Sequence, residues 1–99
     1  MPQLRIALHD GFDGDTVVIT VNGTQVFRRE GVSTDYRVSL AGQHEVTVDE
    51  GPVMVEVALP ERQISSSENL AMTGDLSLGV SLEGTDIRFR QSSERFGYA

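Results

Sequence analysis

The chain has 99 residues, with 8 basic against 15 acidic side chains, a formal charge of −7 and no cysteine. This length predicts one domain, residues 1–99, with a hydrophobic core of its own. The charge argues against a nucleic-acid partner, because phosphate binding needs a basic surface. The absence of cysteine excludes disulfides, thiolate nucleophiles and cysteine metal sites.

The start of the chain, MPQLRIALHD, lacks the basic segment and apolar run of a secretory signal peptide. Apolar runs elsewhere fall short of the ~18 residues that a membrane span needs. A β-rich chain of this size without disulfides is typical of a reducing compartment. We therefore expect a soluble, cytoplasmic protein with no membrane partner.

Short runs rich in Val, Ile, Thr and Leu, bounded by Gly or Pro, predict β-strands in chain order. The runs are QLRIAL (3–8), TVVITV (16–21), TQVFRR (24–29), YRVSL (36–40), HEVTV (44–48), VMVEVAL (53–59), LSLGVSL (76–82) and DIRFR (86–90). In most of them apolar and polar residues alternate, which indicates one buried face. The pattern predicts an all-β fold, a single antiparallel β-sandwich of about 7–9 short strands with immunoglobulin-like or transthyretin-like architecture.

The dipeptide Asn22-Gly23 predicts a two-residue hairpin, because both residues tolerate the positive φ of a type I′ turn. A hairpin of this length predicts the facing pairs Val21 with Thr24, Ile19 with Val26, and Val18 with Phe27.

Residues 60–75 fit two interpretations. The serines and glutamate at 65–68 resemble a capping box, which predicts a single helical turn. The alternation of Leu70 and Met72 equally predicts a short edge strand, and both alternatives stay open.

Acidic residues concentrate in alternate loops. If consecutive strands run antiparallel, loops 9–15, 30–35 and 49–52 meet at one end of the sandwich. Seven carboxylates are then expected there: Asp10, Asp13, Asp15, Glu30, Asp35, Asp49 and Glu50. Calcium takes six to eight oxygen ligands, so Asp10, Asp13, Asp15, Asp35, Asp49 and Glu50 are candidate ligands. Neither Asp10 nor Asp13 begins a loop with the EF-hand spacing, so a site would need several loops, and a hydrated acidic end is the alternative.

The sequence gives little support for catalysis. His9 and His44 are expected at opposite ends of the sandwich, which argues against a shared zinc site. The serines of SSSEN and QSSE lack a nucleophile-elbow motif. We therefore expect no enzymatic activity and no cofactor, calcium aside.

A second apolar surface is expected outside the core. The predicted hairpin register places Val18 and Phe27 on the outer face, and the VMVEVAL strand places Met54 and Ala58 opposite its core valines. Such patches usually contact a partner. The tail, residues 91–99, carries Phe96 and Tyr98, which could cover this patch or exchange with a second copy; a frayed terminus is the alternative.

These features predict a non-catalytic interaction or assembly module whose partner is another protein or a second copy in a homodimer. The alternative is a ligand-binding module with a cation, calcium in particular, or a sugar at the acidic end. An enzyme is the third interpretation.

Overall fold

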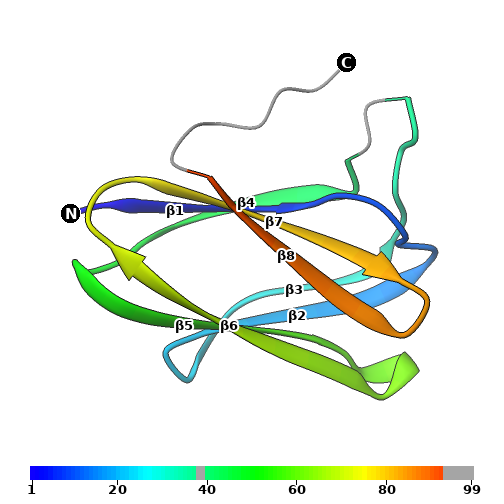
Figure 1. The fold of residues 1–99 in the computed structure, drawn as a ribbon. Coiled ribbons are helices and arrows are strands. Elements are labelled where there is room, and N and C mark those ends of the chain that lie inside the picture. The colour runs from blue at the N-terminus through cyan, green and yellow to red at the C-terminus, as the bar shows by residue number, and fades with distance from the viewer. Residues whose placement is uncertain (38–39, 93–99) are drawn as a thin grey trace.

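In the computed structural model, which describes residues 1–37 and 40–92, two four-stranded sheets pack face to face (Figure 1). One sheet has the order β4-β1-β7-β8 and the other has the order β3-β2-β5-β6. The strands are β1 (Gln3–Leu8), β2 (Asp15–Val21), β3 (Thr24–Val32), β4 (Gly42–Thr47), β5 (Gly51–Leu59), β6 (Ile64–Met72), β7 (Leu76–Glu83) and β8 (Asp86–Ser92). The predicted all-β architecture of two packed sheets is confirmed.

The sequence predicts wholly antiparallel sheets, and the structure differs from this prediction in one pair of strands. β1 pairs antiparallel with β4 on one side and parallel with β7 on the other. The parallel pair arises because the chain reaches β7 from the opposite sheet, through a crossover, rather than through a tight hairpin. All the other pairs within the two sheets are antiparallel.

The core lies between the two sheets and follows the predicted alternation. Every second residue of the central strands is buried, among them Leu4, Ile6, Val17, Ile19, Val55, Val57, Leu78 and Val80. Side chains on one face of a strand repeat every two residues, so the sequence pattern alone assigns these residues to the inner face.

The Asn22-Gly23 turn forms as predicted, but the hairpin register beyond it is wrong. Asn22 and Gly23 have φ values of 49° and 83°, as a type I′ turn requires. Val21 faces Thr24, and a register shift between Ile19 and Thr20 then makes Ile19 face Phe27. An irregularity of this kind adds one residue to one strand, so Phe27, Arg28 and Arg29 exchange their faces before a second shift between Asp15 and Val17.

The predicted strand over residues 36–40 is also wrong at the residues that the structure describes there, Tyr36, Arg37 and Leu40. Asp35 and Leu40 form an isolated antiparallel bridge, with Asp35 N donating to Leu40 O at 2.9 Å. The chain therefore reverses between residues 35 and 40, and Tyr36 and Arg37 form a turn instead of a strand.

The missing strand changes which loops share an end of the sandwich. Residues 9–14, 33–37, 40–41, 60–63 and 84–85 lie at one end, which we call the first-loop end. Residues 22–23, 48–50 and 73–75 lie at the other, the Asn-Gly end. Residues 40–41 and 48–50 are therefore at the ends opposite to those predicted, whereas residues 33–35 lie at the predicted end.

The segment that fits two interpretations contains both a helical turn and a strand. A 3₁₀ turn spans Pro60–Arg62, and β6 follows as a nine-residue edge strand. Ser65 to Glu68, the expected capping box of a helical turn, pair residue by residue with β5. The edge-strand alternative is confirmed, because pairing with β5 overrides the local capping pattern.

Candidate functional site

The loop HDGFDGD, the first candidate for a calcium site, is anchored in the core. Phe12 is only 2% exposed and belongs to the hydrophobic core. Gly11 has a φ of 92° and lies directly against the backbone of Leu82 in β7. Asp10 O accepts a hydrogen bond from Leu82 N at 2.8 Å. The glycine and phenylalanine therefore fix the loop on the end of the sandwich.

Thr34, in the loop that follows β3, fastens the same loop. Its Oγ1 donates to His9 O at 2.6 Å and accepts from Phe12 N at 3.1 Å. Thr34 N donates to Phe12 O at 3.0 Å, and Gly14 N donates to Ser33 Oγ at 2.8 Å. The polar groups of these loops thus bond mainly to each other, which explains the buried Thr34 without a ligand.

Asp15 is the buried carboxylate of the first-loop end, at 5% exposure. Arg62 holds it bidentately, with Nε to Oδ1 at 2.7 Å and Nη2 to Oδ2 at 2.9 Å. Asp13 N donates to the same Oδ2 at 2.9 Å. Burial raises the pKa of the Asp15 carboxyl, but these hydrogen bonds and the Arg62 charge outweigh it, so the pKa lies below its ordinary value.

The 3₁₀ turn supplies a second contact to β2, since Glu61 Oε1 accepts a hydrogen bond from Thr16 N at 2.9 Å. Glu61 and Arg62 together tie the turn to the first loop. The sequence interpretation missed both residues, because they precede a segment whose structure was undecided. Their charges beside a Pro were the only available signal.

Asp35, on the neighbouring loop, is also paired. Arg37 Nη2 donates to Asp35 Oδ2 at 2.8 Å and Arg37 Nε donates to Oδ1 at 3.0 Å. The side-chain hydrogen bond from Arg37 lowers the pKa of Asp35 to about 2. This contact lies within a local turn.

The predicted gathering of seven carboxylates does not occur. Asp49 and Glu50 lie at the Asn-Gly end, away from Asp10, Asp13 and Asp15, because the strand expected over 36–40 is absent. Glu30 is paired with Arg28 on β3 at 3.3 Å. Within residues 1–37 and 40–92, no three His, Cys, Asp or Glu side chains form a group that could hold a metal ion.

The sequence predicts that the two histidines lie at opposite ends of the sandwich, and this prediction is wrong. His9 follows β1 at the first-loop end, and His44 lies in β4 opposite Ile6, in the half of the sheet nearer that end. The His44 ring contacts Phe27 with a centroid distance of 5.4 Å. Burial lowers the pKa of His9; Asp10 opposes this effect and Arg90 reinforces it.

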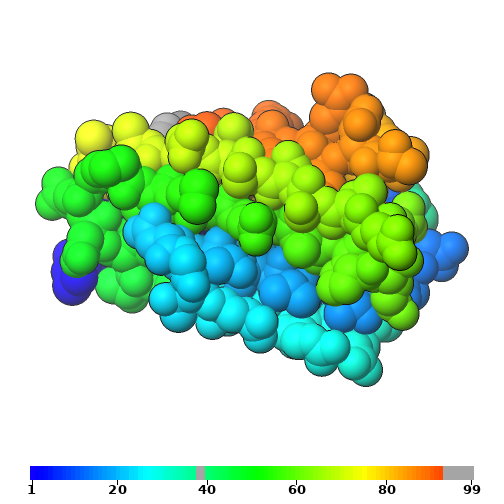
Figure 2. All heavy atoms as spheres, turned by 90° about the horizontal axis from the view of Figure 1, so that it is seen from below, coloured from blue at the N-terminus to red at the C-terminus, as the bar shows by residue number. Residues whose placement is uncertain are grey.

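The expected apolar patch is incomplete. Phe27 packs against the core instead of the outer face, because the register shift in the hairpin turns it inward. Val18 and Ala58 are adjacent on the outer face, but the Thr20–Glu56 pair separates them from Met54, which is 46% exposed. Figure 2 shows this face, with β3, β2, β5 and β6 side by side.

Phe96 and Tyr98 lie outside the described residues. The predicted tail also begins too early, since β8 continues to Ser92.

The outer strands of the two sheets differ in how their edges are protected. β3 has the register shift and carries Arg28 and Arg29, and β8 carries Arg88 and Arg90. β4 faces β3 through the His44–Phe27 contact. β6 has an unbroken ladder with β5 and contains no Lys, Arg or Pro. Bulges, basic residues and prolines are what usually protect an edge strand, and both β6 and β4 lack them. β6 is the longer of the two, with nine residues against six, and its contact with β8 includes a hydrogen bond from Gln91 Nε2 to Glu68 Oε2 at 3.3 Å.

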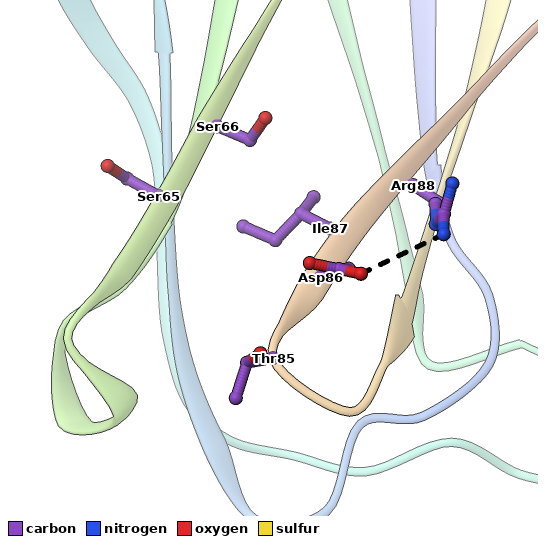
Figure 3. Close-up of a pocket in the computed structure, with 6 residues that line it drawn as sticks. All are labelled: Ser65, Ser66, Thr85, Asp86, Ile87 and Arg88. Carbon is purple, nitrogen blue, oxygen red and sulfur yellow. Dashed lines mark ion pairs between the residues drawn. The ribbon is translucent and has the colours of Figure 1, made fainter.

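A shallow hollow of about 340 Å³ lies where β6 and β8 approach each other. Figure 3 shows Ser66 and Ile87 pointing into the gap from the two strands, with Asp86 and Arg88 forming an ion pair at 3.8 Å. The hollow is lined mostly by polar groups, namely Ser65, Ser66, Thr85, Asp86 and Arg88. It marks the open side of the sandwich.

Comparisons with protein-family models, curated proteins and solved structures found no match to this chain. No helix in the described part of the chain is long and apolar enough to cross a membrane. Among the described residues, the long unbroken edge of β6 and the hollow beside it are the surface features that offer a binding site.

Proposed function

We propose that the protein is a non-catalytic interaction module, and that it binds another protein chain by adding an extended strand to the outer edge of β6. The supporting observation is the edge itself. β6 is nine residues long, pairs without irregularity with β5 and, in the described part of the chain, has no strand on its other side. The outward N–H and C=O groups of such a strand are unused donors and acceptors that another strand can pair with.

The composition of β6 supports strand addition. Its outward face carries Ser65, Ser67, Asn69 and Ala71, small or uncharged side chains that let a second backbone approach. Glu68 is the only charged residue in the strand. The main chain would supply affinity, and the alternating side chains would supply specificity.

Catalysis has less support from the same structure. Asp15 is the one buried carboxylate among the described residues, and Arg62 holds its pKa below the ordinary value. A general base works best when its pKa is near the working pH. Asp15 is better suited to fastening the first loop than to moving protons.

Of the two fold classes expected from the sequence, we favour the transthyretin-like one. Immunoglobulin constant domains place their first two strands in the same sheet, whereas here β1 and β2 lie in different sheets. The strand order therefore departs from the immunoglobulin arrangement.

A cation or sugar at the acidic end remains the alternative function, with less support. Asp15 is already paired with Arg62, and Asp49 and Glu50 lie at the other end of the molecule. We expect 1 mM calcium to raise the melting temperature by less than about 2 °C, as for a dissociation constant weaker than about 1 mM. A larger rise, absent with magnesium, would establish the cation site instead.

Selection from a library of random peptides as long as β6, on the immobilised protein, tests the main proposal. The selected peptides are expected to protect the outward amides of β6 from hydrogen exchange. The amides of β3, the opposite edge of the same sheet, serve as the control and should be unchanged. Peptides that protect another surface, or a failure to select any, would refute strand addition at β6.

A further inference from the structure

We infer that the strand that pairs with β6 is the β6 strand of a second copy of this chain, antiparallel to the first and related to it by a two-fold axis at Ser67. This inference rests on the proposed strand addition and names its partner. The two sheets would then join into one continuous sheet across the axis, in a closed two-fold dimer.

The two-fold axis limits the possible registers. Residues directly opposite each other in an antiparallel pair point to the same face. Ile64, Leu70 and Met72 of β6 face the core side, whereas Ser65 and Ser67 face outward. Core-side residues of one copy must therefore oppose core-side residues of the other, so the axis passes through a residue and not between two.

An axis at Ser67 gives compatible pairs along the core side of the strand. Ile64 then lies opposite Leu70 of the second copy, an apolar pair. Ser66 lies opposite Glu68 of the second copy. Glu68 Oε2 accepts from Gln91 Nε2 at 3.3 Å, so the Ser66 hydroxyl would donate to Oε1. Cross-strand pairs of these kinds stabilise a sheet.

Axes at the two neighbouring residues give poorer pairs. An axis at Glu68 places the two Glu68 carboxylates directly opposite each other, which is destabilising. An axis at Ser66 places Ile64 opposite Glu68 and so sets an apolar side chain against a charge. The single charge of β6 therefore selects the Ser67 register.

The open side of the sandwich gives a second reason to expect a partner here. Ile64 of β6 and Ile87 and Phe89 of β8 pack against the core but remain only partly buried. Ile87 points toward β6 across the hollow in Figure 3. A second copy joined at β6 would approach this side and cover apolar surface that the first copy leaves wet.

The net charge of the chain predicts how this dimer responds to salt. Each copy carries −7, so two copies repel each other over a distance that salt shortens. We expect the dimer fraction to rise with ionic strength. A dimer held by ion pairs would show the opposite dependence.

Cysteine cross-linking tests the register, and the chain has no cysteine of its own to interfere. In Ser67→Cys the two thiols lie opposite each other, with Cα atoms about 4.5–5.5 Å apart, within reach of a disulfide. In the control Ser65→Cys the two thiols are four residues out of register, about 13 Å apart. Mild oxidation should therefore cross-link Ser67→Cys in dimeric protein and leave Ser65→Cys as single chains.

Charge exchange at the next pair outward provides an independent test, because Ser65 opposes Asn69 of the second copy in this register. Ser65→Lys/Asn69→Glu creates two attractive pairs across the axis, whereas Ser65→Lys/Asn69→Lys creates two repulsive ones. The dimer dissociation constant should fall in the first variant and rise in the second, each by about 2- to 30-fold relative to wild type. Sedimentation measures both constants, and circular dichroism confirms that each variant is folded.

The outcomes separate this inference from the proposed function. A wild-type chain that stays monomeric at ~1 mM, or a dimer in which Ser67→Cys does not cross-link, overturns the self-pairing inference. Strand addition at β6 survives that result if the selected peptides protect β6. A dimer that forms while β6 exchanges freely overturns the self-pairing inference, and strand addition is overturned as well when no selected peptide protects β6.

Discussion

Gly11 is the position at which the first loop approaches β7 most closely, and replacing it by alanine tests how that loop is built. Gly11 and Gly14 both have positive φ values, 92° and 66°, in the same loop. A Cβ at Gly11 would lie 2.8 Å from Leu82 Cβ and closer still to the Leu82 carbonyl oxygen, whereas a Cβ at Gly14 would meet no atom within 4 Å. Gly14→Ala is therefore a matched control that shares the backbone strain but not the collision.

The two substitutions should differ by the cost of moving β7. Alanine in a left-handed conformation costs roughly 1–2 kcal/mol at either position, and the loss of unfolded-state freedom acts similarly on both. At Gly11 the collision adds about 1–3 kcal/mol, as overpacking does elsewhere, because Leu82 N is bonded to Asp10 O and Leu82 is buried. For a domain of this size the added cost corresponds to a melting temperature lower by about 5–20 °C.

Thermal and urea unfolding followed by circular dichroism measure both variants against the wild type. Gly11→Ala should melt well below Gly14→Ala, with a similar dependence on urea concentration. If the two variants melt within about 2 °C of each other, the approach to Leu82 is loose, and the loop is not held in the way described above.

Two further predictions concern the pair at Asp15 and the corrected position of Phe27. Asp15→Asn should lower the free energy of unfolding by about 1.5–3 kcal/mol at pH 7. The pKa of Asp15 is lower in the folded state than in the unfolded state, so the wild type loses this advantage as the pH falls through the folded-state pKa. The difference in unfolding free energy between the two proteins should therefore shrink between about pH 5 and pH 2. A difference that stays constant over this range would mean that Asp15 is not held as a carboxylate. Phe27→Ala should cost about 2 kcal/mol, near half the cost for a fully buried Phe, because the ring packs between the core and His44. A loss of unfolding free energy below about 0.5 kcal/mol, measured by urea unfolding, would mean that the Phe27 side chain faces solvent and not the core.

Several elements of the fold follow from local sequence pattern. The alternation in LSLGVSL and VMVEVAL assigns Leu78, Val80, Val55 and Val57 to a buried face, and the structure confirms it. Asn22-Gly23 forms its turn because few other pairs of residues accept two positive φ values in succession. These features depend on single residues and on a period of two, which are visible in any sequence.

The predicted location of the acidic site depended instead on the number of strands, and the local sequence pattern did not predict that number correctly. YRVSL has the composition of a strand, but the bridge between Asp35 and Leu40 reverses the chain there. One strand fewer moves Asp49 and Glu50 to the opposite end, and one register shift in β3 turns Phe27 inward. An error of one strand moves the later loops to the other end of the sandwich, and an error of one residue turns the later side chains to the other face of the sheet. Such errors therefore alter a predicted site far more than a predicted core.

The sequence by itself determined the class of fold, the inner faces of β1, β2, β5 and β7 and the turn at Asn22-Gly23, because each depends on neighbours in the chain. Only the tertiary structure decided that β1 runs parallel to β7, that Arg62 holds Asp15 across the first-loop end, and that β6 is an outermost strand of its sheet among the described residues. Those contacts join residues far apart in the chain, whose partners are selected by packing between the sheets and not by local pattern.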